Sequence, residues 1–198
     1  MSRVGKTIIK IPAGVKVEAV GNTISATGPK GVLIQEIKSC IVAEVSETSI
    51  ELKRNNDESQ TKALHGLYNR LIQNMVNGVT TGFTKTLILN GVGYKAAMKG
   101  QDLSLALGYS HPIEVKAEEG INFKICTPAE VQTMNLGKDG IGVVIQIMGA
   151  SKERVGGMAS KIRDLRPVEP YHMYGVRYSD EHVVRKESKS GKKAGGKK

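Results

Sequence analysis

Short apolar runs in the first 54 residues alternate with turn residues, which is typical of β-strands joined by tight turns. Between residues 15 and 20, the apolar side chains Val15, Val17 and Ala19 fall on every second position, so they share one face of an extended strand. The same reasoning predicts further strands at 8–11, 33–37, 41–45 and 49–54.

A longer pattern with helical spacing follows these strands. Apolar residues recur every three or four positions from Ala63 to Val79, which predicts an amphipathic helix. We expect Asp57 to cap its first turn, with Gln60 completing a capping box, and Asn77-Gly78 to end it. The first part of the chain therefore contains a set of strands followed by one helix.

The second part of the chain repeats this order. Segment 100–113 echoes segment 21–33: each contains a tight turn, a strand, a second turn centred on glycine and another strand. A helix is expected to begin at Ser151 as its N-cap, to carry an apolar stripe from Val155 to Leu165 and to end before Pro167. The strands that precede this helix are predicted at 83–89, 94–99, 103–107, 113–116, 122–126 and 143–148.

One repeat of this length indicates the duplication of a domain rather than a solenoid of many short units. The predicted fold class is α+β: two similar domains from an internal duplication, each a small, mostly antiparallel sheet packed by a helix, plus a basic C-terminal tail. We place the N-terminal domain at residues 1–81, the C-terminal domain at 82–180 and the tail at 181–198.

Composition limits the kinds of protein that this chain can be. The 39% apolar content supports compact cores, built from Val, Ile, Leu and Ala because the chain has no Trp and two Phe. No apolar run approaches the length of a membrane span, and the N-terminus lacks the hydrophobic stretch of a signal peptide. Cys40 and Cys126 lie far apart without neighbouring ligands, which favours two thiols in a reducing cytoplasm over a zinc site or a disulfide.

Positive charge is concentrated at the C-terminal end. Residues 151–198 contain thirteen Lys or Arg against six Asp or Glu, which is +7 of the net charge of +10. Tyr171, Tyr174 and Tyr178 lie among these cations, and such a mixture is typical of proteins that bind polyphosphates. The alternative, a solvated basic tail without a ligand, applies better to 189–198 than to 151–185, where the charge lies on patterned sequence.

Three glycine motifs have a structural as well as a functional interpretation. Gly28-Pro29-Lys30-Gly31 matches the phosphate clamp of KH domains, but that clamp joins helices and strands are expected here, so a turn is the better account. Gly91-Val92-Gly93-Tyr94 lacks the third glycine of a dinucleotide fingerprint, although its glycines would let a nucleic-acid backbone come close. Gly156-Gly157 leaves room either for an incoming backbone of protein or RNA or for close packing on the sheet of its own domain.

The sequence does not indicate catalysis. None of the four histidines lies in a G-x-S-x-G elbow, an H-E-x-x-H helix or a comparable frame. His65 is expected to be an ordinary packed side chain of the first helix, whereas His111 lies in a turn that suits stacking or phosphate binding. A phosphate-ester enzyme is disfavoured because the sequence shows no acidic metal cluster, so we expect no metal, cofactor or small-molecule substrate.

The chain also resembles the family of the bacterial large-subunit ribosomal protein six (the L-six family), from its first residues almost to the tail. Each matching motif is short, but their order on a duplicated α+β chain makes the combination specific. The motifs are Ser2-Arg3-Val4-Gly5-Lys6, Gly21-Asn22-Thr23, Gly28-Pro29-Lys30-Gly31, Ala63-Leu64-His65-Gly66, Asn74-Met75-Val76-Asn77-Gly78-Val79, Gly91-Val92-Gly93-Tyr94-Lys95-Ala96, Leu107-Gly108-Tyr109-Ser110-His111-Pro112 and Arg166-Pro167-Val168-Glu169-Pro170-Tyr171.

The resemblance implies a structural role in the cytoplasm: binding to large-subunit ribosomal RNA near the sarcin–ricin loop and the stalk base, where translational GTPases dock. It also implies neighbouring ribosomal proteins as partners, no membrane, and a larger share of the binding for the second domain and tail. Together with the charge pattern, it gives the candidate RNA-binding residues Lys95, Tyr109, Ser110, His111, Lys152, Arg154, Lys161, Arg163, Arg166, Tyr171, His172, Tyr174, Arg177, Arg185, Lys186, Lys189, Lys192 and Lys193.

Three features depart from the family's pattern. After the family's Glu-Pro-Tyr a run of lysine and glycine is expected, but His172-Met173-Tyr174-Gly175 stands there instead. Two phosphate-binding cations are therefore missing, and Tyr174 and the 189–198 tail are the candidates to compensate. The stretch 136–150 is longer than the family's, and Ile8 replaces a frequent proline.

The charge alone would also allow an architectural DNA-binding protein, although no groove-entering motif is recognisable. For a protein that contacts about 6–10 phosphates, affinity falls roughly a thousand-fold or more between about 50 and 200 mM salt. Truncation after Tyr178 is expected to weaken association with ribosomal subunits without unfolding either domain.

Overall fold

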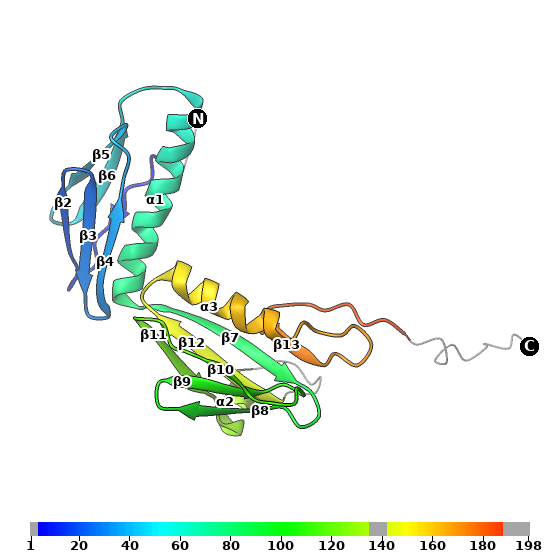
Figure 1. The fold of residues 1–198 in the computed structure, drawn as a ribbon. Helices are drawn as coiled ribbons and strands as arrows, with labels where there is room; N and C mark the ends of the chain where they lie inside the picture. Colours follow the sequence, from blue (N-terminus) through cyan, green and yellow to red (C-terminus); the bar gives the residue numbers. More distant parts are fainter. Residues whose placement is uncertain (1–3, 135–141, 188–198) are drawn as a thin grey trace, which may run out of the picture. The chain divides into compact units, whose positions relative to one another are not determined.

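The computed structural model describes residues 4–134 and 142–187 (Figure 1). Within these limits the chain divides into two compact units. Unit 1 contains residues 4–83 and 149–154, and unit 2 contains residues 84–134, 142–148 and 155–187. Among the helices in the described ranges, none has both the length and the apolar character that a membrane crossing requires.

Unit 1 consists of two antiparallel three-stranded sheets and one long helix. Helix α1 spans Ser59–Thr80. The first sheet has the order β1-β6-β5, and these strands span Ile9–Lys10, Ser49–Arg54 and Ile41–Val45. The second sheet is a meander of β2, β3 and β4, which span Lys16–Val20, Thr23–Gly28 and Gly31–Glu36.

The core of unit 1 follows from the two periodicities of its sequence. On β3, Ile24 and Ala26 are buried, whereas Ser25 between them is partly exposed. Ile72 and Val76 of α1 lie one helical turn apart and join Ile24 in one hydrophobic cluster. The alternation of the strands and the spacing of the helix therefore bury a shared apolar layer.

Two buried polar residues of α1 form hydrogen bonds with backbone carbonyl oxygens of neighbouring segments. His65 Nε2 lies 2.9 Å from the carbonyl oxygen of Leu52, which confirms His65 as an ordinary packed side chain. The amide group of Asn69 donates to the carbonyl oxygens of Gly5 and Thr7, at 3.2 and 2.8 Å. These bonds fix the N-terminal segment of the described chain against the helix.

Unit 2 repeats this plan with additions. Helix α3 spans Lys152–Leu165, and its apolar stripe packs in a core that includes Leu87 and Leu105. The meander of unit 2 is formed by β8, β9 and β10, which span Lys95–Lys99, Asp102–Ala106 and Ile113–Val115. The other sheet has the order β11-β12-β7-β13, and these strands span Ile121–Ile125, Val143–Gly149, Phe83–Asn90 and Gly175–Tyr178.

The topology confirms the predicted duplication and the α+β fold class. The order β1-β6-β5 of unit 1 corresponds to β7-β12-β11 of unit 2, and the two meanders correspond in the same way. Every predicted strand is present, with ends within two residues of the expected positions. The sequence pattern did not predict β13 or the short helix α2 (Pro128–Thr133), and neither has a counterpart among the described residues of unit 1.

The predicted N-terminus of the first helix is wrong, whereas that of the last helix is confirmed. The N-cap of α1 is Glu58, without a side-chain capping bond. Asp57 lies one residue before this N-cap, and its carboxylate accepts a hydrogen bond of 2.6 Å from Arg54 instead of capping the helix. In α3, the amide of Arg154 donates to Ser151 Oγ at 3.4 Å, as expected of an N-cap three residues earlier.

The first helix also continues past the predicted stop at Asn77-Gly78. The hydroxyls of Thr80 and Thr81 donate to carbonyl oxygens of the last turn, at 2.7 and 3.0 Å. Gly82 then adopts a left-handed φ of 74° and ends the helix. The side chains of the two threonines thus satisfy carbonyls that an earlier stop would have left to solvent.

The Gly28–Gly31 motif is a structural turn between β3 and β4, as expected from the flanking strands. The amide of Lys30 donates to the carbonyl oxygen of Val79 at 3.0 Å, and its ammonium group bonds to the carbonyl oxygen of Thr81. A Cβ at Gly28 would lie 2.7 Å from the Val79 oxygen, so glycine is needed for this approach. The turn therefore docks on the C-terminal end of α1.

Candidate nucleic-acid interface

The residues after α3, 166–187, fold back over unit 2, and we call them the C-terminal segment. Its strand β13 pairs antiparallel with β7, so that Val176 lies opposite Leu89. The amide of Val176 donates to the carbonyl oxygen of Arg166 at 2.9 Å, which closes the loop between α3 and β13. Backbone hydrogen bonds therefore hold the segment in a defined conformation.

Two backbone positions set the shape of this loop. Gly175 has a φ of 142°, and a Cβ there would lie 2.6 Å from the Cα of Val168. Met173 is the one non-glycine residue with positive φ in the described chain, at 63°, and its carbonyl oxygen accepts a hydrogen bond of 3.2 Å from Asn90. The close approach at Gly175 explains why the loop requires glycine there.

The loop closes one side of an open hollow of about 490 Å³ in unit 2. Its lining combines aromatic rings, one guanidinium and one carboxylate, and comes from three separate parts of unit 2. We call it the aromatic hollow, and its lining residues are Val92, Tyr94, Gly108, Tyr109, Arg166, Pro167, Glu169 and Tyr174.

Arg166 is held inside this hollow by tyrosines. Its guanidinium carbon lies 5.1 Å from the centre of the Tyr109 ring, and the Tyr109 hydroxyl donates to the carbonyl oxygen of Leu165 at 2.9 Å. Hydrogen bonding to Tyr109 and Tyr94 raises the pKa of Arg166 further above its ordinary value. The hollow therefore contains a permanent cation stacked on a ring that is itself anchored to the end of α3.

Three large hydrophobic side chains at the hollow are exposed. Val92 is 84% exposed, Tyr109 45% and Tyr174 40%. Single exposed apolar side chains are common on protein surfaces, whereas a group of them around one concavity makes the hollow a candidate interaction site.

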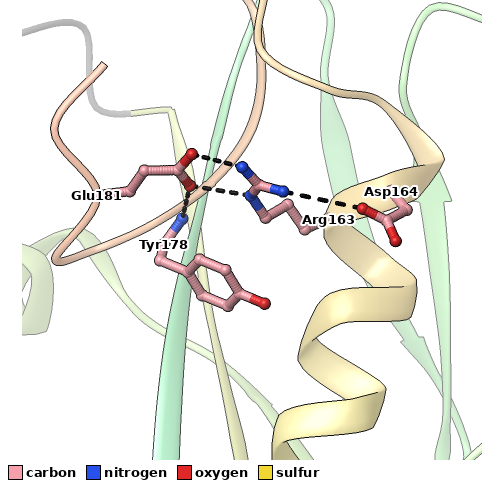
Figure 2. Close-up of polar contacts among 4 residues, drawn as sticks. All are labelled: Arg163, Asp164, Tyr178 and Glu181. Atoms are coloured by element: carbon pink, nitrogen blue, oxygen red, sulfur yellow. Dashed lines mark hydrogen bonds and ion pairs between the residues drawn. The ribbon is translucent and has the colours of Figure 1, made fainter.

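Arg163, one of the predicted RNA-binding cations, has partners within the protein. Its Nε and Nη2 donate to the two carboxylate oxygens of Glu181, at 2.9 and 2.6 Å (Figure 2). The same carboxylate accepts a bond of 3.1 Å from the amide of Tyr178, and the Arg163 guanidinium lies 5.5 Å from the Tyr178 ring centre. This bidentate pair fastens the end of β13 to α3.

The pKa values of Arg163 and Glu181 shift in the directions expected of an ion pair. Arg163 lowers the pKa of the Glu181 carboxyl, with Arg177 as a weaker contributor. Glu181 in turn raises the pKa of Arg163. Asp164 also lies 3.8 Å from Arg163 (Figure 2), so the charge of Arg163 is largely compensated within the chain.

Several other candidate residues likewise have partners within the protein. Lys161 bonds to Glu118 at 2.5 Å, and Arg185 Nε donates to the carbonyl oxygen of Tyr171 at 3.1 Å. His172 stacks on Tyr174 with ring centres 5.6 Å apart. These three side chains therefore make contacts within unit 2.

The remaining candidates divide by location. Tyr109, Arg166 and Tyr174 meet at the aromatic hollow. Lys152 and Arg154 belong to unit 1, and Arg177 lies on β13 with a buried Nε that has no hydrogen-bond partner in the described structure. Lys95, Ser110, His111, Tyr171 and Lys186 are exposed. Lys189, Lys192 and Lys193 lie outside the described residues.

The list of candidates omitted two lining residues of the hollow, Tyr94 and Glu169. Tyr94 follows the Gly91-Val92-Gly93 turn, and this turn was the signal that could have identified it. Glu169 gave no such signal, because a carboxylate is not expected to bind phosphate. Within the described ranges, no group of three His, Cys, Asp or Glu is placed to hold a metal ion.

Comparison with known proteins decides the family. The family model described as ribosomal protein L6 matches residues 11–82 and 90–179. The chain belongs to the ribosomal protein L6 family. Its two matched segments correspond to the two copies of the repeat, so the L6 family shares the duplicated architecture.

Relatives in the L6 family agree over nearly the full length. The chain is 45% identical over 192 residues to the large ribosomal subunit protein uL6 of Staphylococcus saprophyticus, covering 97% of this chain and all of that protein. It has the same identity and coverage to the protein of this name in Staphylococcus aureus strain JH9. The resemblance inferred from the sequence motifs is therefore confirmed.

Proposed function

We propose that this chain is a structural protein of the large ribosomal subunit in the cytoplasm. In this proposal it binds large-subunit ribosomal RNA through unit 2 and the residues that follow it. The site lies near the sarcin–ricin loop and the stalk base, beside neighbouring ribosomal proteins. The proposal includes no catalysis and no cofactor.

The observation that carries the proposal is the aromatic hollow. A concavity with three tyrosines and a stacked arginine suits folded RNA, in which unpaired bases and backbone are recognised by shape and stacking. Relatives named as large-subunit proteins, similar over almost the whole chain, support RNA of that subunit as the partner.

The distribution of charge supports a division of labour. Residues 84–187 contain fourteen Lys or Arg against twelve Asp or Glu, so this part is close to neutral. Residues 188–198 contain five lysines and no acidic residue. In this proposal the folded surface supplies shape and stacking, and the terminal lysines supply most of the attraction to phosphates.

Cosedimentation with large ribosomal subunits tests the proposal. The full chain is expected to bind stoichiometrically and to leave the subunits only at high salt. A salt-independent association would contradict the electrostatic part. Equal competition by duplex DNA would favour the alternative, an architectural DNA-binding protein.

The structure changes the design of the truncation experiment. A cut after Tyr178 also removes Glu181, the partner of Arg163, so it would disturb α3 and β13 together. It would also remove the amide of Ser179, which donates to the carbonyl oxygen of Thr86 at 3.1 Å. A cut after Glu187 removes the terminal lysines and keeps these contacts.

A further inference from the structure

We propose that the aromatic hollow holds a single unstacked nucleobase of folded RNA, and that Arg166 and Glu169 bind its polar edge. The inference rests on the proposed function and deepens it by naming the ligand of this site. The alternative within the same function is a phosphate site. The lining, the charge and the rigidity of the hollow distinguish the two.

The lining suits a flat aromatic ligand. Tyr94, Tyr109 and Tyr174 come from three separate segments of unit 2, and they account for half of the six tyrosines of the chain. Bases stack on such rings with about 1–3 kcal/mol per base. A phosphate has no face to stack, so it would leave the exposed rings of Tyr109 and Tyr174 unused.

The charge of the hollow argues against phosphate. Arg166 and Glu169 are the two charged residues of its lining, and they have opposite signs. A carboxylate next to a phosphate would be repelled, whereas a base edge presents both donors and acceptors. Guanine fits best, because its N1–H and N2–H groups can donate to a carboxylate while O6 and N7 accept from a guanidinium.

Glu169 retains an oxygen for this purpose. The amide and Nδ1 of His172 lie 3.2 and 3.1 Å from Glu169 Oε2, so both contacts use the same oxygen. Within the described residues, this leaves Oε1 as an acceptor for a ligand. The contacts with His172 also fix the carboxylate in position.

The rings are held in place before any ligand binds. The amide of Glu169 donates to the carbonyl oxygen of Tyr174 at 2.8 Å, and the Tyr174 ring stacks on His172 with an interplanar angle of 21°. Such order lowers the entropic cost of binding.

The experiment is an amide NMR titration of the full chain with GMP, AMP, ribose 5-phosphate and inorganic phosphate. GMP is expected to shift the amides of residues 91–94, 108–109 and 166–174, and to bind more tightly than AMP. Ribose 5-phosphate and inorganic phosphate are expected to leave these amides unchanged. If ribose 5-phosphate shifts them as GMP does, or GMP shifts none of them, the proposal is wrong. Equal affinity for AMP overturns the assignment of guanine.

Matched variants test whether GMP binds at the aromatic hollow. Tyr174→Ala and Glu169→Gln are each expected to weaken GMP binding about tenfold, which corresponds to about 1.4 kcal/mol. Tyr174→Phe keeps the ring, so it is expected to restore the binding that Tyr174→Ala loses. Glu187→Gln removes an exposed carboxylate outside the hollow and is expected to bind GMP as the unaltered chain does. Unchanged binding by Tyr174→Ala would overturn the stacking role.

A second readout uses assembled subunits and kethoxal, which modifies the N1 and N2 edge of unpaired guanine. One guanine of the large-subunit RNA is expected to be protected with the unaltered chain and to become reactive with Tyr174→Ala. If the chain cosediments with subunits but no guanine changes, the base site fails and the proposed function stands. If the chain does not cosediment, the proposed function fails.

Discussion

Unit 1 and unit 2 share one architecture, and one of the differences between them lies at the edge of a sheet. In unit 1, β1 has two residues and pairs with β6 at the end of its sheet. In unit 2, the corresponding strand β7 has eight residues and lies between β12 and β13. The added β13 belongs to the C-terminal segment, which also carries Arg166, Glu169 and Tyr174 of the aromatic hollow. The duplicated fold therefore serves as a scaffold, and the extension of one copy completes the candidate interface.

The corresponding hairpin turns of the two units show the same contrast. The β3–β4 turn of unit 1 docks on the end of α1 through the amide of Lys30. The β9–β10 turn of unit 2 docks on the end of α3 through the hydroxyl of Tyr109. In unit 1 the lysine side chain is also used internally, on Thr81. In unit 2 the docking hydroxyl leaves the Tyr109 ring partly exposed beside Arg166.

The largest effect is expected from filling the space at Gly175. In Gly175→Val, the new side chain meets the backbone of Val168, so β13 should detach from β7 and unit 2 should lose about 2–4 kcal/mol of stability. Hydrogen exchange resolved along the chain measures this loss in unit 2 and its absence in unit 1.

The matched control is Gly21→Asn in unit 1. Gly21 also has positive φ, 58°, but a Cβ there meets no atom within 4 Å. Asparagine tolerates this conformation, so a loss below about 1 kcal/mol is expected. If Gly175→Val leaves the exchange of β7 unchanged, β13 does not contribute to unit 2 as described.

The next prediction concerns the terminal lysines and their contribution to phosphate binding. Removal of residues 188–198 takes away five lysines and is expected to reduce the slope of log affinity against log salt by about 3–4. Binding of the shortened chain to large subunits near 0.1 M salt should weaken about ten- to a hundred-fold. An unchanged salt slope would show that the folded surface carries the phosphate contacts.

A smaller loss of stability is expected when the ion pair between α3 and the C-terminal segment is removed. Glu181→Gln loses the ionic part of its pair with Arg163, and unit 2 should lose about 1 kcal/mol after allowance for solvent screening. Asp180→Asn breaks the more exposed pair with Lys85 and should change stability much less, as judged by urea unfolding. Equal losses from the two variants would contradict the special role of Glu181.

The Glu181 carboxylate is expected to make the stability of unit 2 depend on pH. Arg163 lowers the pKa of Glu181 below the ordinary value of 4.5, so the folded state binds this proton more weakly than the unfolded state. Its stabilising contribution is therefore complete above pH 4.5 and is lost as the pH falls through the lowered pKa. Unfolding curves of the unaltered chain and Glu181→Gln should converge in acid, and parallel curves would contradict this account.

The smallest predicted effect concerns Gly156 and Gly157 in α3. A Cβ at either position meets no atom within 4 Å, which contradicts one of the two interpretations of these glycines, close packing on the unit's own sheet. Gly157→Ala should stabilise the isolated chain by about 0.5–1 kcal/mol in thermal unfolding, because alanine favours the helix. If this variant is more stable but no longer assembles with large subunits, the second interpretation, an incoming backbone, is supported.

The sequence predicted the elements that depend on local periodicity. The alternation at Val15, Val17 and Ala19 and the helical spacing from Ala63 to Val79 gave the strands and the helix, because burial of one face determines both patterns. Strand β13 was missed because its four residues, Gly175–Tyr178, form a strand only through pairing with the distant β7. The periodicity of one segment carries no information about such a partner.

The candidate interface was predictable only in part, because residue type can be seen in the sequence but contacts between distant segments cannot. Tyr109, Arg166 and Tyr174 stood out by residue type within a basic, aromatic region. The pairing of Arg163 with Glu181, eighteen residues later, depends on the return of the chain after α3, so composition overestimated the charge available to a ligand. Tyr94 and Glu169 became recognisable once the fold brought three segments together.

The most direct test of the central claim is ultraviolet crosslinking of the full chain to ribosomal RNA within purified large subunits, with the crosslinked peptides identified by mass spectrometry. The account predicts that these peptides come mainly from residues 91–95, 107–111 and 163–198, in unit 2 and the residues that follow it. Crosslinks that fall mainly in residues 4–83, with none in the C-terminal segment, would contradict it.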